Sequence, residues 1–170
     1  EGGVTFSGGE PLMQAEFIAE VIDQLKDIHV VLDTSGYGSE EAFRMLVSRS
    51  NLIYLDLKII DREEHRKHTG RYNDLILSNV QQLKQLGKPF HVRVPLVPGV
   101  TDTAKNLADI ASTIKDIPSL VQVDLLPYNK AAGGKYEACG MIFNPDYNEN
   151  EALNIDLSPF QNQGITVQQY

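Results

Sequence analysis

Residues that can bind or orient a charged ligand recur in this sequence directly after short apolar runs. They stand at Ser7-Gly8-Gly9-Glu10, Asp33-Thr34-Ser35, Asp56-Leu57-Lys58, Arg93 and Tyr128-Asn129. Two adjacent glycines let a backbone approach a ligand closely, and Glu10 adds a carboxylate beside the exposed carbonyl groups. The first of these segments therefore suits an ammonium group.

Each of these residues also has an ordinary structural explanation. Two glycines suit a tight turn between a strand and a helix. Asp56 and Lys58, two positions apart, point to the same side of a strand and can form an ion pair. Asp33 can cap the following turn, and Arg93 can pair with a carboxylate without contacting a ligand. The ordered occurrence of all of them favours a shared site.

The elements that must position these residues alternate between strands and helices. Continuous apolar runs, bounded by polar or turn residues, predict strands over residues 4–7, 29–33, 52–58, 90–97 and 121–126. Strands that are apolar on both faces and alternate with helices imply parallel pairing with right-handed crossovers. The predicted class is α/β.

Helix boundaries follow from capping residues. Ser39 is an expected N-cap, and Glu40 and Glu41 place negative charge on the first helical turn. A helix that ends in Leu86 is expected to close at Gly87. Asp102 or Thr103 is expected to cap the helix after the fourth strand.

The polar residues help to decide which parallel fold is present. An open doubly wound sheet concentrates its site at one switch point, whereas a barrel draws it from successive strand ends. Five strands with functional ends therefore predict a partial (βα) TIM-type barrel of about five parallel βα units. We expect a single domain over residues 1–170, with regular units over 1–129 and an irregular tail over 130–170, in which 164–167 resembles a last strand.

Composition excludes several classes of protein. The net charge is -8, which disfavours nucleic acid as a partner. No apolar run of about 18 residues and no signal-peptide pattern occur, so no membrane association and a cytoplasmic location are expected. Cys139 is the single cysteine, which excludes a disulfide framework or a multi-thiolate metal site within these 170 residues.

Taken together, these segments resemble the activating enzymes of glycyl radical enzymes, such as that of pyruvate formate-lyase, in the radical S-adenosylmethionine (SAM) superfamily. The resemblance covers nearly the whole chain and rests on ordered segments: Gly2 to Pro11, Asp33-Thr34-Ser35-Gly36, Asp56-Leu57-Lys58, Val92 to Asp102, Leu125 to Asn129 and Gly134-Lys135-Tyr136. His65, Thr69 and Gly70 also fit the family pattern, without an assigned role. The resemblance implies that the chain holds about five units of a (βα)6 radical SAM barrel.

The resemblance also implies roles for individual residues. The segment around Glu10 would hold the amino group of SAM, and the cofactor-binding set would be Ser7, Gly8, Gly9, Glu10, Asp56, Lys58, Arg93 and Asn129. A monovalent cation beside the ligand's carboxylate would be held by Asp33, Thr34 and the backbone of Tyr54. No residue of this chain would be catalytic in the chemical step.

The remaining machinery of the family would lie outside these residues. A [4Fe–4S] cluster would be held by three cysteines, which we expect to precede Glu1 in a longer protein. Such an enzyme would cleave SAM reductively, with flavodoxin or ferredoxin as reductant, and would place a glycyl radical on a partner enzyme. The chain alone is expected to be inactive, and its exposed sheet edges suggest a dimer.

Two other functions fit the residues. One is a cluster-free half-barrel that binds SAM or another small molecule. The other is an unrelated (βα) barrel lyase that uses Lys58 as a Schiff-base nucleophile. A metal site at His65 and His68 is disfavoured because no third ligand is evident and the segment is a solvated charge run.

Overall fold

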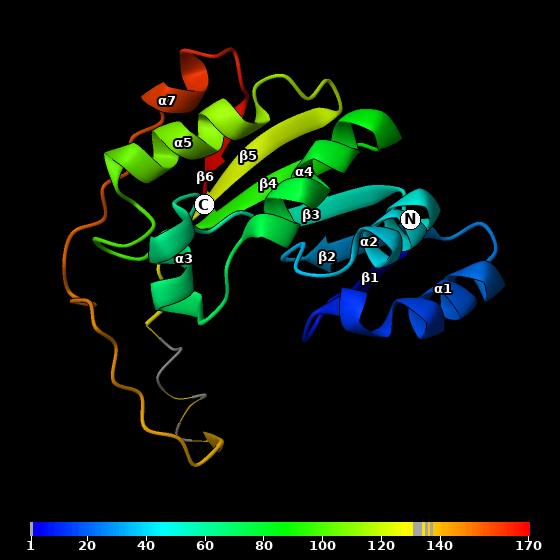
Figure 1. Cartoon of the computed structure of the whole chain (residues 1–170), viewed down its shortest axis with the longest axis horizontal. Coiled ribbons are helices and arrows are strands. Elements are labelled where there is room, and N and C mark those ends of the chain that lie inside the picture. Colours follow the sequence, from blue (N-terminus) through cyan, green and yellow to red (C-terminus); the bar gives the residue numbers. More distant parts are fainter. Residues whose placement is uncertain (1, 131–133, 135, 137) are drawn as a thin grey trace.

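The computed structural model describes residues 2–130, 134, 136 and 138–170 of the chain. The strands are β1 (Gly3–Phe6), β2 (His29–Thr34), β3 (Leu52–Asp56), β4 (Phe90–Pro95), β5 (Leu120–Leu126) and β6 (Val167–Gln169). They form one six-stranded parallel sheet in the order β1-β2-β3-β4-β5-β6 (Figure 1). The predicted α/β class and partial barrel are confirmed, and the last strand begins at the end of the predicted 164–167 stretch.

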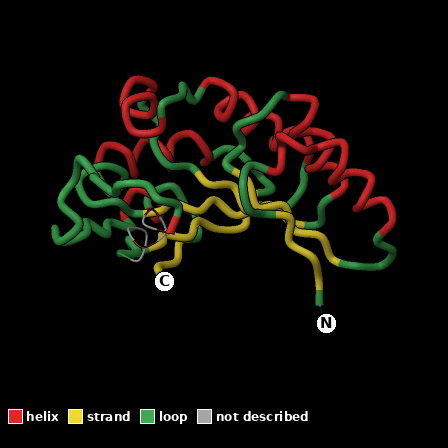
Figure 2. Tube along the Cα trace, turned by 90° about the horizontal axis from the view of Figure 1, so that it is seen from below, coloured by secondary structure: helices red, strands yellow, loops and turns green. Residues whose placement is uncertain are grey.

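The helices lie on one side of this sheet. They are η1 (Pro11–Gln14), α1 (Ala15–Gln24), α2 (Glu40–Arg49), α3 (Arg62–Thr69), α4 (Asp74–Leu86), α5 (Ala104–Ile114) and α7 (Ser158–Gln161). Figure 2 shows the strands as a curved layer beneath the helices. None of these elements covers the opposite, concave face of the sheet.

The predicted helix ends are largely confirmed. Ser39 accepts a hydrogen bond from the Ala42 amide at 3.1 Å, and α4 ends at Gly87. Of the two candidate caps for α5, Thr103 takes the role and accepts from the Asn106 amide. Asp102 instead is buried and accepts from the amides of Gly99 and Asn154, so it fastens the tail to the turn after β4.

Helix α3 was not predicted from apolar periodicity, because the segment is nearly all charged. Its ends are fixed by capping: the Asp61 side chain accepts from two backbone amides, and Gly70 closes the helix. The solvated reading is wrong for His65, which is 5% exposed. Its Nδ1 lies 2.8 Å from the Arg71 carbonyl oxygen, a contact that explains this histidine as part of the closing turn. Over the described residues, no group of three or more His, Cys, Asp or Glu side chains is arranged to hold a metal ion.

Alternation along the strands separates the core from the site. Side chains such as Leu32, Ile53, Val92 and Val123 are buried against the helices, while the residues between them face the concave side. Because the register pairs Asp56 with Arg93, polar side chains from neighbouring strands meet there.

The tail returns to the sheet after β5. Phe160 of α7 is fully buried, and the Tyr128 hydroxyl contacts Tyr147 and Glu149. Desolvation raises the pKa of Tyr128, and the hydrogen bond to Glu149 adds to the rise. Lys135 of the predicted Gly134-Lys135-Tyr136 loop lies outside the described residues. In the part of the chain that the structure describes, no helix is long and apolar enough to cross a bilayer.

Candidate functional site

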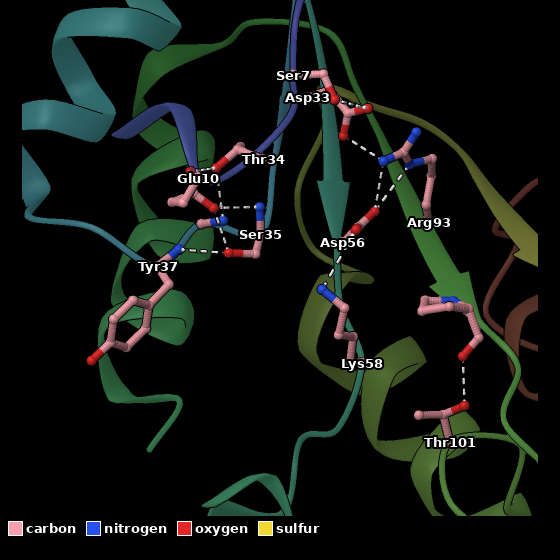
Figure 3. Close-up of polar contacts among 12 residues, drawn as sticks. Ser7, Glu10, Asp33, Thr34, Ser35, Tyr37, Asp56, Lys58, Arg93 and Thr101 are labelled. Atoms are coloured by element: carbon pink, nitrogen blue, oxygen red, sulfur yellow. Dashed lines mark hydrogen bonds and ion pairs between the residues drawn. The ribbon is translucent and has the colours of Figure 1, made fainter. Parts of the chain in front are cut away.

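An ion-pair network joins the carboxyl ends of β2, β3 and β4 on the concave face (Figure 3). Arg93 lies between two carboxylates: its guanidinium pairs with Asp33, and its Nε donates to Asp56 at 3.0 Å. Asp56 also pairs with Lys58 at 3.5 Å, and the Ser7 hydroxyl donates to Asp33 at 3.1 Å. Four of the predicted site residues are therefore brought together with Asp33, and both ordinary ion-pair readings are confirmed.

The network fixes the charge of Arg93. Burial alone would lower the pKa of its guanidinium, but the carboxylates of Asp56 and Asp33 outweigh burial and raise the pKa above its ordinary value. Only 23% of the Arg93 side chain is exposed, so this cation is held at a fixed point on the concave face.

A second cluster surrounds Glu10 beside the end of β2. Its Oε1 accepts from the Leu12 amide at 3.1 Å and from the Thr34 hydroxyl. Its Oε2 accepts from the Ser35 amide at 2.9 Å and from the Ser35 hydroxyl. Figure 3 shows these contacts next to the ion-pair network. Glu10 thus ties the turn after β1 to the end of β2.

The turn between Ser7 and Glu10 is open to solvent. Gly8 has φ 110°, a conformation that favours glycine, and a Cβ added at Gly8 or Gly9 would meet nothing within 4 Å. Among the described residues no donor contacts the carbonyl oxygen of either glycine. Both carbonyl oxygens are therefore acceptors without a donor among the described residues.

The residues predicted to hold a monovalent cation lie on neighbouring strands, and the register pairs Asp33 with Tyr54. Asp33 faces the concave side and pairs with Arg93, whereas the Thr34 hydroxyl donates to Glu10 and accepts from the Gly36 amide. The Tyr54 ring lies 5.3 Å from the Arg93 guanidinium. Asp33 therefore already has a cationic partner in Arg93. A monovalent cation held by Asp33, Thr34 and the backbone of Tyr54 stays a prediction.

Sequence reasoning missed a further set of interacting side chains on β4 and β5, which includes His91, two positions before Arg93. His91 Nδ1 lies 3.1 Å from Asp124 Oδ2, and the His91 ring packs edge-on against Tyr54 with centroids 5.2 Å apart. Gln122 donates to the other Asp124 oxygen at 2.6 Å. A usable signal was present, because Gln122 and Asp124 interrupt an otherwise apolar strand. Ser35 was also missed as a partner of Glu10.

A cavity of about 210 Å³ connects the two clusters. Its lining includes Glu10, Ser35 and Tyr37 on one side and Asp56 and Lys58 on the other. A larger cavity of about 500 Å³ lies near α3, α5 and residues 146–151, and it contains none of the strand-end network. We place the site beside the smaller cavity because Glu10, Asp56 and Lys58 line it, whereas Asp33, Arg93 and the two glycines lie outside its lining. The predicted site residue Asn129 lies elsewhere, exposed just after β5.

Known relatives of the chain are activating enzymes. It is 38% identical over 143 residues to the 4-hydroxyphenylacetate decarboxylase activating enzyme of Clostridioides difficile, covering 82% of this chain and 45% of that protein. It is 41% identical over 141 residues to the trans-4-hydroxy-L-proline dehydratase activating enzyme of the same species, covering 80% and 46%. The pyruvate formate-lyase-activating enzyme of Clostridium pasteurianum is 34% identical over 144 residues, covering 84% and 60%. The chain spans about half the length of the first two relatives.

A solved structure supports the same relationship. A domain of pyruvate-formate lyase-activating enzyme from Bacteroides vulgatus superposes with a TM-score of 0.78 at 25% identity, covering 100% of this chain and 99% of that one. The model of the Radical SAM superfamily matches residues 2–111, a range that includes both clusters described above. Since this match spans more than half of the chain, the chain belongs to the radical SAM superfamily.

Proposed function

We propose that this chain is the SAM-binding and SAM-orienting part of an activating enzyme for a glycyl radical enzyme. The main observation in support of this proposal is that charged side chains converge at the ends of neighbouring parallel strands: Glu10, Asp33, Asp56, Lys58 and Arg93. Relatives at 34–41% identity that are named as activating enzymes support the reaction class.

The donor set fits the charged end of SAM. The methionine end carries an ammonium, a carboxylate and a sulfonium. The carbonyls of Gly8 and Gly9, which accept no hydrogen bond from the described residues, suit the ammonium, and Lys58 and Arg93 suit the carboxylate. The cavity of about 210 Å³ is smaller than the 300–1,000 Å³ typical of a whole ligand site, so it suits one end of the ligand. We assign Asn129, exposed after β5, to the adenosine end.

Bound SAM and a [4Fe–4S] cluster supply the radical chemistry in this superfamily, and the protein supplies orientation and electrostatics. The chain has a single cysteine, Cys139, so the 170 residues do not fit a cluster held by three thiolates. We derive no step through the cluster. Within these residues the chain's own contribution is to bind the ligand and hold its charged groups in place.

The first test is binding of SAM to the chain, measured by titration calorimetry. We expect saturable binding by the wild type. Lys58→Met should weaken it about 10- to 150-fold, because a charge-assisted hydrogen bond to the carboxylate is worth about 1.5–3 kcal/mol. Lys26→Met is the matched control, since Lys26 is exposed and lies in the turn before β2. A wild-type chain that does not bind SAM would overturn the proposal.

A second test concerns catalysis. The chain alone, incubated with SAM and dithionite under anaerobic conditions, is expected to form no 5′-deoxyadenosine, because one cysteine cannot hold the cluster. Chromatography of the products measures this directly. Formation of 5′-deoxyadenosine at a rate above that of a protein-free control would contradict the assignment.

The proposal also includes a protein partner, a reductant, a cellular location and an oligomeric state. The glycyl radical enzyme is the proposed protein partner, with flavodoxin or ferredoxin as the reductant of the complete protein in the cytoplasm. The edge strands β1 and β6 each pair with one neighbour, so a dimer through an exposed edge is also proposed.

A further inference from the structure

The buried carboxylate of Asp124 lies beside Arg93 in the sheet. The register places Asp124 opposite Arg93 on the neighbouring strand β5, and neighbouring strands lie about 4.8 Å apart. Within the described part of the chain the two side chains nevertheless form no ion pair. Arg93 pairs instead with Asp56 on β3 and with Asp33 on β2, two strands away. The guanidinium is thus turned away from one of the two carboxylates that flank it in the register.

Both oxygens of Asp124 already have other partners. His91 Nδ1 lies 3.1 Å from Oδ2, and Gln122 Nε2 donates to Oδ1 at 2.6 Å. An ionised carboxylate only accepts hydrogen bonds, so His91 Nδ1 must carry the hydrogen. The Asp124 side chain is 6% exposed, compared with 17% and 23% for the two carboxylates that Arg93 contacts. A buried charge is costly without a partner, so Asp124 would compete strongly for Arg93 if His91 did not hold it.

The Tyr54 ring supports the orientation of Arg93. Tyr54 lies on β3 opposite His91 in the register, and the two rings pack edge-on with centroids 5.2 Å apart. The Arg93 guanidinium lies 5.3 Å from the centre of the same Tyr54 ring, and a cation is attracted to an aromatic face. His91 therefore holds Asp124 on one side and packs on the other side against the ring that attracts Arg93.

We propose that His91 is a positioning residue for the ligand site: together with Gln122 it holds the Asp124 carboxylate, and this keeps Arg93 turned towards β3, where the guanidinium meets the carboxylate of SAM. The inference rests on the proposed function, in which Arg93 and Lys58 receive that carboxylate. Its physical basis is competition between carboxylates, because a guanidinium that pairs with Asp124 no longer faces the ligand.

His91→Phe tests this role, because it keeps a ring beside Tyr54 and removes the donor to Asp124. We expect SAM to bind about tenfold more weakly, near the lower limit for the loss of a charge-assisted hydrogen bond. Decarboxylated SAM, in which hydrogen replaces the carboxylate, should keep its wild-type affinity to within about twofold, since it has no group for Arg93 to bind. His29→Phe is the matched control and should leave SAM affinity unchanged, because His29 is exposed at the start of β2.

A second substitution distinguishes competition from structural damage. In the double variant His91→Phe/Asp124→Asn, a neutral amide no longer attracts the guanidinium, so SAM affinity should return to within about threefold of the wild type. A purely structural role of His91 predicts that both ligands bind more weakly to the same extent and that the second substitution adds damage. Equal weakening of both ligands, unchanged SAM binding by His91→Phe or no recovery in the double variant would each overturn the proposal. Calorimetric titration measures the affinities, and circular dichroism checks that each variant is folded.

A crystal structure of the ligand-free His91→Phe variant distinguishes failure of this inference from failure of the proposed function. The Arg93 guanidinium should contact Asp124 in that structure. If it still contacts Asp33 and Asp56, the positioning role fails whether or not the wild type binds SAM. If Arg93 has moved but the wild type does not bind SAM, the proposed function fails, and the role of His91 in ligand binding fails with it.

Discussion

Replacing Arg93 with leucine is expected to have the largest effect on ligand binding, a loss of about 100-fold in SAM affinity, or about 2.7 kcal/mol. The guanidinium contacts both Asp33 and Asp56. Without it, two carboxylates that are 17% and 23% exposed face each other on the concave surface, and the ligand's carboxylate would approach them with no balancing charge from β4. Calorimetric titration with SAM measures the loss.

The same substitution should lower the free energy of unfolding by about 2 kcal/mol, because removing one partner leaves half-buried charges uncompensated. Urea denaturation measures this. Arg49→Leu is the matched control: Arg49 pairs with Asp23 on the surface, where both side chains are at least 36% exposed, and such pairs contribute about 0–1 kcal/mol. Equal destabilisation by the two substitutions would contradict the argument.

A double variant isolates the cause. If repulsion between the two carboxylates produces the loss of stability, adding Asp56→Asn to Arg93→Leu should recover about half of the lost free energy. No recovery would mean that the lost contact between the guanidinium and the Tyr54 ring is responsible instead.

The parallel sheet could be predicted because its strands are nearly continuous in apolar residues and alternate with helical segments. Parallel strands place their carboxyl ends at one edge. The order of the segments along the chain was therefore enough to predict that Asp33, Asp56, Lys58 and Arg93 lie close together. The individual contacts did not follow. Arg93 pairs with Asp33 on a strand that is not its neighbour, and that reach depends on the curvature of the sheet and on side-chain length.

The contacts of Glu10 and the His91–Asp124 pair could not be predicted from the sequence either, because they depend on local backbone geometry. Thr34 and Ser35 are 24 and 25 residues from Glu10, and the path of the intervening turn decides which of them it meets. His91 and Asp124 are 33 residues apart, and a register shift between Phe90 and His91 sets their alignment. Such local irregularities have no periodic pattern in a single sequence.

Helix α3, by contrast, could have been predicted from its capping residues. Its residues lack an apolar stripe, so periodicity gave no signal, although both of its capping residues were visible in the sequence. Asp61 and Gly70 would have predicted it if capping had been weighed without periodicity. The buried His65 is then explained by the turn that the helix must close rather than by its charged neighbours.

Gly38→Ala is expected to have the largest effect on stability, a loss of about 3 kcal/mol in the free energy of unfolding. An added Cβ would lie 2.5 Å from the Cβ of Leu12 and 2.8 Å from its Cδ1, closer than side chains pack. Leu12 is 4% exposed in η1, so it has little room to move. Urea denaturation measures the loss, and Gly2→Ala is the control, because a Cβ at Gly2 meets nothing within 4 Å.

Gly38→Ala should also affect the ligand site, because the Leu12 amide donates a hydrogen bond to Glu10. Displacing η1 would pull this donor away from the carboxylate and loosen the turn that carries Gly8 and Gly9. SAM affinity should therefore fall about tenfold in Gly38→Ala, although Gly38 itself has no part in ligand binding. Unchanged affinity together with reduced stability would show that η1 yields without moving Glu10, and that the packing of Leu12 and the orientation of the ligand are independent.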